Sequence, residues 1–189
     1  MNNPGADQLF IQLIFKNLNN MKNPITILIT CLIIGAVALG CKDDEPQFET
    51  KDFEATFFTD LASIGPDSIT CAAPRNFLNV QEGSGSEATV GNFTTTITFC
   101  VDPATLEYGD SEASFVAENG DELFLDVSGQ VVPSTEPGYD LEFKDPFTII
   151  GGTGRFEGAT GSGMTNSFVS NATQRTDHVW KGTITLKNR

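Results

Sequence analysis

The sequence predicts an all-β domain: a small closed or nearly closed antiparallel β-barrel of about eight strands, with a β-sandwich as the alternative. Apolar and polar residues alternate along most segments after residue 52, which is the period of a half-buried strand. Turn signals rich in Gly, Pro, Asn and Asp separate these segments, and none of them has a convincing helical period. One apolar face per strand and many short connections favour a barrel or a sandwich.

The alternating segments can be placed in order along the chain. Phe53, Ala55 and Phe57 share one face of a first strand, and the clearest alternation runs from Phe93 to Val101. Strands are predicted at 53–57, 93–101, 122–127, 141–143, 147–150 and 177–186. Turns are predicted at Gly83-Ser84-Gly85, Asp102-Pro103, Asn119-Gly120-Asp121, 133–138 and Gly161-Ser162-Gly163. Asn119-Gly120 is the strongest hairpin signal, because a type I′ turn needs positive φ at both central residues.

Residues 1–40 are predicted to be a signal peptide and not part of the domain. Met21-Lys22-Asn23 is a short positive segment, and the uncharged apolar run 25–40 follows it. A membrane-spanning helix needs about 20 apolar residues, so a run of this length suits a cleavable signal better. Residues 1–20 lie upstream of a better translation start at Met21.

Ala38-Leu39-Gly40-Cys41 resembles the lipobox of bacterial lipoproteins, in which the cysteine receives a diacylglycerol and becomes the new N-terminus. Lys42, Asp43 and Asp44 resemble the surface-export signal of Bacteroidota-type lipoproteins; an ordinary solvated charge run is the alternative. The resemblance implies an outer-membrane protein that is lipid-anchored at Cys41 and faces the medium. The predicted domains are a lipidated flexible tether, 41–52, and a β-barrel domain, 53–189.

Charge and cysteine content exclude several classes of partner. Without residues 1–40 the chain keeps 9 of its 11 basic and 24 of its 25 acidic residues, so nucleic acid is not an expected partner. Cys71 and Cys100 remain as two thiols in an oxidising compartment, and we expect a disulfide between them. With a single histidine in the chain, no metal site and no cofactor are predicted.

Three segments resemble known families. Residues 87–94, 117–124 and 147–161 together resemble a family of small secreted bacterial proteins. The glycine-rich part of 147–161 is also similar to a segment of the dirigent and allene oxide cyclase group of eight-stranded, calycin-like barrels. The resemblance covers roughly residues 77–186 and implies a barrel. It carries over no catalytic residue, because no catalytic motif of that group is recognised here.

The segment Gly151-Gly152-Thr153-Gly154-Arg155-Phe156 has two physical interpretations. A phosphate-binding loop needs a helix directly after its glycines. Here more glycines and strand-like residues follow, so nucleotide binding is not expected. We expect a sharply bent strand with close backbone approach, Phe156 closing one end of the core, and Arg155 outside or salt-bridged.

His178 and Trp180 are the candidate ligand-lining residues, since they share one face of the last strand. An exposed histidine at the rim is the preferred interpretation, and a general base inside the barrel is the alternative. Trp180 is expected in the core, with a stacking platform for a ligand as the alternative. Asp67-Ser68-Ile69 matches a short O-glycosylation motif, which makes Ser68 a candidate for modification.

Two functions of different class follow from these observations. The first is a small-ligand-binding or structural module on the membrane, with a small apolar or glycan ligand. The second is an isomerase or cyclase of the allene oxide cyclase or dirigent kind, which rests on fold analogy alone. A lumen filled by Phe and Ile would favour the module, and a buried ionisable group in an open lumen would favour the enzyme.

Overall fold

The structure is a computed structural model that describes residues 47–188 and is all-β in that range. Its strands are β1 (Phe48–Pro66), β2 (Phe77–Glu87), β3 (Gly91–Val101), β4 (Glu107–Ala117), β5 (Glu122–Val127), β6 (Gly129–Gln130), β7 (Val132–Pro133), β8 (Leu141–Phe143), β9 (Pro146–Gly152), β10 (Thr160–Met164), β11 (Ser167–Ser170) and β12 (Arg175–Lys187). A single 3₁₀ turn, η1 (Gly154–Phe156), is the one helical element in residues 47–188. Over the same range, no helix has the length and apolar character needed to span a membrane.

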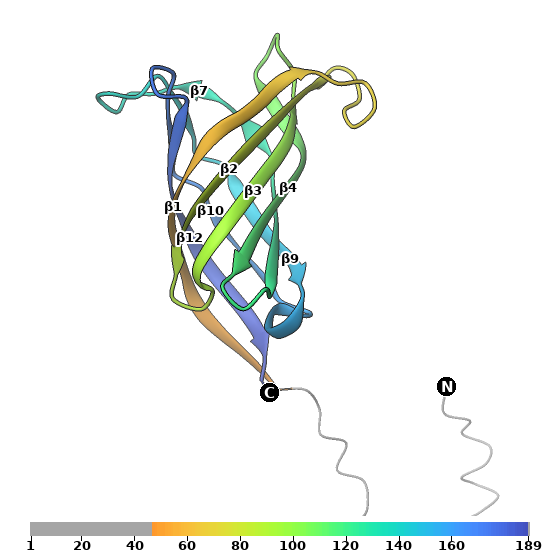
Figure 1. Cartoon of the computed structure of the whole chain (residues 1–189), viewed down its shortest axis with the longest axis vertical. Coiled ribbons are helices and arrows are strands. Elements are labelled where there is room, and N and C mark those ends of the chain that lie inside the picture. The colour runs from red at the N-terminus through yellow and green to blue at the C-terminus, as the bar shows by residue number, and fades with distance from the viewer. Residues whose placement is uncertain (1–46, 189) are drawn as a thin grey trace, which may run out of the picture. The chain divides into compact units, whose positions relative to one another are not determined.

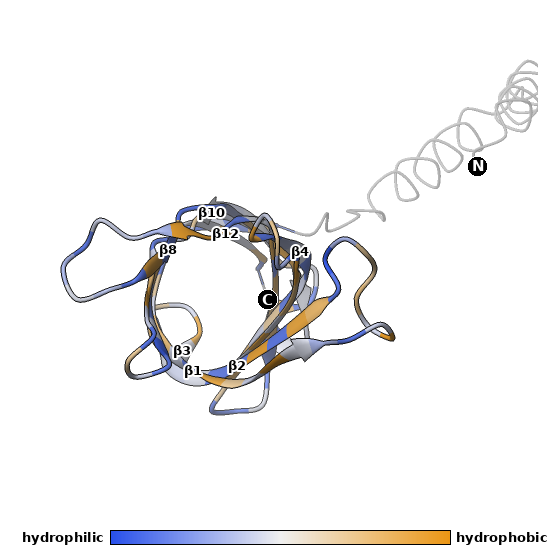
Figure 2. Ribbon diagram, turned by 90° about the horizontal axis from the view of Figure 1, so that it is seen from above, coloured by the Kyte–Doolittle hydropathy of each residue, from blue (hydrophilic) through white to orange (hydrophobic). Residues whose placement is uncertain are grey.

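Eight strands form a ring in the order β1-β2-β3-β4-β5-β9-β10-β12, and β12 returns to pair with β1. Every pairing is antiparallel, which confirms the predicted barrel. The shorter strands β11, β8 and β7 continue the wall beyond β10 and β9. Viewed from above, the ring surrounds one interior (Figure 2). It is irregular, and the sandwich alternative also fits its packing.

The barrel has two distinguishable ends. At one end Phe48 of β1 pairs with Lys187 of β12, so both termini of the domain lie together there (Figure 1). We call this the tether end. At the other end, Pro66 of β1 pairs with Phe77 of β2, and the longer loops project. We call this the mouth.

The tether predicted at 41–52 is too long at its C-terminal side. Strand β1 begins at Phe48, and residues 48–52 pair with 183–187 of β12. Their side chains are exposed, so the apolar alternation that identifies the strand starts only at Phe53. Residues 1–46, including Cys41, Lys42, Asp43 and Asp44, lie outside the described residues.

Aromatic side chains fill the interior toward the tether end. Phe53, Phe115, Phe147 and Phe156 are each at most 1% exposed. The Phe115 ring stacks on Phe93 at a centroid distance of 4.1 Å and meets Phe57 edge-on at 5.1 Å. Such pairs contribute about 0.5–1.5 kcal/mol each beyond their burial. This half of the barrel therefore has a packed aromatic core.

Two of the predicted turns lie inside strands. Gly83-Ser84-Gly85 belongs to β2, and Gly161-Ser162-Gly163 belongs to β10. A Cβ at Gly83 would lie 1.8 Å from the backbone oxygen of Phe58, and one at Gly163 would lie 2.1 Å from that of Lys181. These glycines are therefore needed where neighbouring strands approach closely, not where the chain reverses.

The hairpin predicted at Asn119-Gly120 joins β4 to β5, but its turn type differs from the prediction. Gly120 has a φ of +85°, whereas Asn119 is not among the residues with positive φ. The Gly120 amide donates to the Ala117 carbonyl at 2.9 Å, and the Ala117 amide donates to the Asp121 carbonyl at 2.9 Å. A type I′ turn requires positive φ at both central residues, so this connection belongs to another class.

The glycine segment that ends β9 behaves as the structural interpretation predicts. Gly151 has a φ of +138°, and a Cβ at Gly152 would lie 2.2 Å from the backbone oxygen of Glu122. Phe156 is 0% exposed and closes the core at the tether end. The Arg155 guanidinium donates to the Val90 carbonyl at 2.5 Å and lies 3.9 Å from an Asp121 carboxylate oxygen. No nucleotide-type helix follows, since the η1 turn ends at Phe156.

Candidate functional site

An open cavity of about 190 Å³ occupies the mouth of the barrel. Strands β1, β2, β3, β8, β11 and β12 and the loops above them form its wall. Its lining residues are mostly apolar, with a few neutral polar ones: Leu61, Ile64, Asn79, Gln81, Phe99, Val101, Leu106, Val131, Leu141, Phe143, Val169, Asn171, Gln174 and Thr176. A 150 Å³ apolar cavity is large enough to hold benzene. The mouth cavity is therefore large enough for a ligand with one ring.

A smaller cavity of about 30 Å³ shares Gln81, Phe99 and Phe143 with the mouth cavity. We call it the inner cavity. It is lined by Gln81, Ile97, Phe99, Tyr108, Ser111, Val127, Phe143, Thr165, Ser167, His178 and Trp180. This volume suits about one water molecule, for which roughly 10–15 Å³ is the minimum. Both candidate residues of the last strand thus line the barrel interior.

The expected rim position of His178 is wrong: its side chain is only 5% exposed. The prediction assumed that the wall ends near the start of the last strand. Strand β12 begins at Arg175, but β1 continues to Pro66 and β2 starts at Phe77, so the neighbouring strands extend past His178. The imidazole also stacks on the Phe57 ring at 4.3 Å with an interplanar angle of 7°.

His178 belongs to a buried chain of hydrogen bonds that crosses four strands. The Trp180 indole N–H donates to Ser167 Oγ at 3.0 Å, and Ser167 Oγ lies 2.8 Å from His178 Nδ1. On the other side, His178 Nε2 lies 2.9 Å from Thr59 Oγ1, and the Thr59 hydroxyl donates to Gln81 Oε1 at 2.6 Å. Side chains from β11, β12, β1 and β2 thus meet at one imidazole.

The donors in this chain assign the tautomer of His178. Because the Thr59 hydroxyl donates to Gln81, its oxygen accepts the hydrogen of His178 Nε2. Nδ1 then accepts the hydroxyl hydrogen of Ser167, whose oxygen accepts the Trp180 N–H. Both ring nitrogens are therefore satisfied while the ring is neutral.

Burial lowers the pKa of His178 to about 3, and the nearby Asp177 carboxylate acts in the opposite direction. The group is consequently neutral at physiological pH. A general base works best when its pKa lies near the working pH. His178 has the position that a lumenal base would need, but its environment makes it a weak base.

Trp180 is 3% exposed, as expected for the core, and its ring packs on Phe147 at 5.5 Å. It is the single tryptophan of the chain and lines the inner cavity. The indole therefore serves the core and faces the cavity at the same time. Its fluorescence is a natural reporter of that cavity.

Tyr108 lines the inner cavity from β4, and its hydroxyl donates to an Asp145 carboxylate oxygen at 2.9 Å. Burial raises the pKa of Tyr108 far above its usual range, and the Asp145 carboxylate adds to the effect. Asp145 lies between β8 and β9, and it also accepts from the Gln130 amide at 3.4 Å. The Asp145 side chain thus accepts hydrogen bonds where the chain leaves β8 and before β9 begins.

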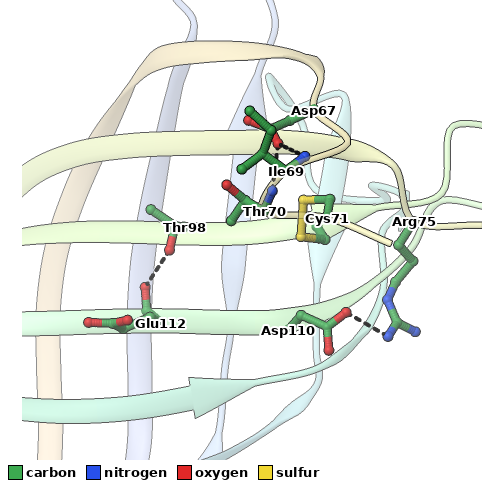
Figure 3. The surroundings of a disulfide bond; sticks show 9 residues. Asp67, Ile69, Thr70, Cys71, Arg75, Thr98, Asp110 and Glu112 are labelled. Atoms are coloured by element: carbon green, nitrogen blue, oxygen red, sulfur yellow. Dashed lines mark hydrogen bonds and ion pairs between the residues drawn. A yellow bond between two sulfur atoms is a disulfide. The ribbon is translucent and has the colours of Figure 1, made fainter. Parts of the chain in front are cut away.

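The disulfide predicted between Cys71 and Cys100 is present, with a Cα–Cα distance of 5.5 Å. It ties the loop between β1 and β2 to β3 beside the mouth (Figure 3). In the same loop, an Asp67 carboxylate oxygen accepts from the Ile69 and Thr70 amides, and these bonds lower the pKa of Asp67. Arg75 pairs with Asp110 at 2.9 Å. Ser68 is exposed on this loop.

Residues 47–188 contain no group of three or more His, Cys, Asp or Glu side chains arranged to hold a metal ion. The acidic side chains of β4 and β5 are mostly exposed, and Asp121 pairs with Arg155. These carboxylates therefore form a solvated, acidic part of the surface.

The chemical rarity of His and Trp makes His178 and Trp180 candidates from sequence alone. Thr59, Gln81 and Ser167 are not predicted, because Ser, Thr and Gln are common in strands. The alternation of β2 is the available signal: Asn79 and Gln81 have the same parity and are both buried. The glycines of β2 obscure that strand in the sequence.

The chain is similar in structure to two solved pterocarpan synthase dirigent proteins. The first matches with a TM-score of 0.48 and 11% identity, over 77% of this chain and 99% of that protein. The second has a TM-score of 0.45 and 14% identity, over 79% of this chain and 90% of that protein. No protein-family model matches the chain, and no curated protein matches it. Because a fold does not determine a function, the residues that line the mouth are the evidence for what it does.

Proposed function

We propose that the barrel is a binding module that holds a small, largely apolar ligand in its mouth. The observation that carries this proposal is the mouth cavity of about 190 Å³ above a core filled by aromatic rings. Ligand sites are typically concave and apolar, with a small number of polar groups that orient the ligand. The mouth has this composition, with Asn79, Gln81 and Thr176 as its buried polar groups.

The second candidate is an isomerase or cyclase that uses the same cavities. One observation favours it: His178 is an ionisable group buried beside the inner cavity. The chemistry of the group argues against it. Both imidazole nitrogens are hydrogen-bonded in the neutral ring, and burial lowers the pKa of His178 to about 3. Binding is therefore the function that the geometry supports better.

We also propose that the module is attached to the outer membrane by a lipid on Cys41 and is displayed on the surface. The support is the lipobox-like sequence before Cys41 and the sequence Lys42-Asp43-Asp44 after it. From Cys41 to Phe48 the chain can span at most roughly 25 Å. Strand β1 begins at the tether end, so the chain enters the barrel at the end opposite the mouth.

Ethylbenzene is a suitable probe of the proposed function, because it is apolar and has one ring. Titrating it into the ¹⁵N-labelled protein should shift the amide resonances of residues that line the mouth. Val169→Trp fills the cavity and should abolish these shifts, whereas Val132→Trp is a matched control on an exposed residue outside the lining. An absence of saturable shifts in the wild type would refute the binding proposal.

A further inference from the structure

Two buried polar side chains in the wall of the mouth have hydrogen-bond donors that the described chain does not use. Thr176 on β12 is 3% exposed, Gln81 on β2 is 7% exposed, and both line the mouth cavity. Within residues 47–188 neither the Thr176 hydroxyl nor Gln81 Nε2 has a hydrogen-bond partner, and neither atom is fully enclosed. Leaving a buried donor unpaired destabilises a protein. Donors of this kind in a cavity wall therefore point to a group that a ligand supplies.

The two donors flank Thr59 on the inner face of the wall. Thr176 lies directly opposite Thr59 in the pairing of β12 with β1, and both side chains are buried. Residues at opposite positions have Cβ atoms about 4.5–5.5 Å apart. The Thr59 hydroxyl donates to Gln81 Oε1 at 2.6 Å, and that hydrogen bond orients the Gln81 amide. Because Gln81 also lines the inner cavity, these side chains lie at the inward end of the mouth.

The lining of both cavities has no formal charge. None of the described lining residues is Asp, Glu, Lys or Arg, and burial lowers the pKa of His178 so that it is neutral. An ion bound there would lose its hydration without meeting an opposite charge, which is strongly unfavourable. The chain also carries a net charge of −14, which disfavours anions in particular.

We infer that the ligand of the mouth is an uncharged molecule of about one ring whose inward end carries a hydrogen-bond acceptor, such as a carbonyl oxygen. An amide nitrogen can only donate, whereas a threonine hydroxyl can donate or accept, so an acceptor is the group that suits both side chains. The aromatic residues Phe99 and Phe143 line the same cavity and contact the apolar body. This inference rests on the proposed binding function and names the chemical class of its ligand.

Acetophenone, ethylbenzene and benzoate test the inference, because they share a ring and differ in the polar group. Dissociation constants are measured by NMR titration for the wild type and for Thr176→Val and Gln81→Met, which each remove one donor and keep a similar size. In at least one variant the preference for acetophenone over ethylbenzene should fall about fivefold relative to the wild type. Comparing this ratio between proteins cancels the different solubilities of the two probes. Benzoate should show no saturable binding where acetophenone saturates.

Thr183→Val is the matched control, because it makes the same substitution on β12 at an exposed residue outside both cavities. Its preference ratio should equal that of the wild type. Urea unfolding of Thr176→Val should show unchanged or increased stability, as expected when an unpaired polar atom is removed. Equal ratios in the wild type and both donor variants would overturn the inference while leaving the binding proposal intact. Tight binding of benzoate would also overturn it. If ethylbenzene fails to bind, the binding proposal itself is lost.

Discussion

Burial and its hydrogen-bond partners hold His178 neutral. The Phe57 ring covers one face, Thr59 accepts from Nε2, and Ser167 donates to Nδ1. Protonating the ring would add a hydrogen at Nδ1, which faces a hydroxyl that already accepts from Trp180. Burial of the charged form is the main cause of the low pKa of His178, and the carboxylate of Asp177 acts in the opposite direction. At the residue scale, His178 is therefore a structural group that also lines a cavity.

The buried histidine predicts a pH-dependent stability. Burial lowers the pKa of His178 to about 3, from 6.5 in the unfolded chain, so its contribution is complete above pH 6.5 and declines as the pH falls toward 3. His178→Gln should be less stable at pH 7 by roughly 2 kcal/mol, since it loses the stacking and the two hydrogen bonds. The gap between the two proteins should narrow by about 2 kcal/mol between pH 7 and pH 5.

Urea unfolding at pH 7, 6 and 5 measures this gap. Ser167→Ala is the control, because it keeps the imidazole and should retain the pH dependence of the wild type. A gap that is constant with pH would mean that His178 titrates equally in the folded and unfolded chains.

Only the chemically distinctive residues of the site could be predicted from the sequence. His178 and Trp180 are unique in the chain, and their shared strand face follows from the alternation of β12. The depth of His178 could not be predicted, because it depends on how far β1 and β2 extend. Asn79 becomes distinctive only because its buried Oδ1 has no hydrogen-bond partner among residues 47–188.

Among the elements, β2 and β10 show why part of the wall could not be predicted. In both strands glycine faces a neighbouring backbone at a distance that no Cβ would fit, as at Gly83 and Gly161. A glycine needed for close packing and a glycine needed for a turn are identical in sequence. By contrast, the predicted strand 93–101 matches β3 except for its first two residues, and Phe93, Thr95, Ile97, Phe99 and Val101 are all buried as the alternation predicts.

The disulfide holds the longest connection at the mouth to the barrel. Cys71 and Cys100 are separated by 29 residues, and both are buried. Crosslinking a loop of that size restricts the unfolded chain by roughly 3.5 kcal/mol on the chain-entropy model. Phe99 and Val101 flank Cys100 and line the mouth cavity, so the crosslink also supports the proposed ligand site.

The double variant Cys71→Ala/Cys100→Ala should melt roughly 10 °C lower than the oxidised wild type. Differential scanning calorimetry measures the change. The control is the wild type in reducing agent, whose melting temperature should fall by a similar amount. If mass spectrometry of the protein purified without reductant shows the mass of the form with two free thiols, the assigned pairing is wrong.

At the scale of the whole molecule, the two ends of the barrel suit different tasks. The tether end is closed by Phe156 and receives the chain from the N-terminal side through β1. The mouth holds the cavity and the crosslinked loop. The lipid attachment that we propose on the N-terminal side of β1 would leave the cavity accessible from solution. The net charge of −14 would also keep the domain away from an anionic lipid surface.

The proposed anchor can be tested by two variants in the native host. Cys41→Ala should lose metabolic lipid labelling and leave the membrane fraction, because stable anchoring needs two or more acyl chains at about 0.8 kcal/mol per buried CH₂. Replacing Lys42, Asp43 and Asp44 by Ala should keep the lipid but protect the protein from protease added to intact cells. Replacing Lys51 and Asp52 instead is the control, since these exposed residues belong to β1 and should not affect export. Membrane retention of the processed Cys41→Ala protein would exclude the lipid anchor. Unchanged protease sensitivity of the triple variant would exclude the export role of Lys42-Asp43-Asp44, while the ligand site at the mouth would stand independently of both results.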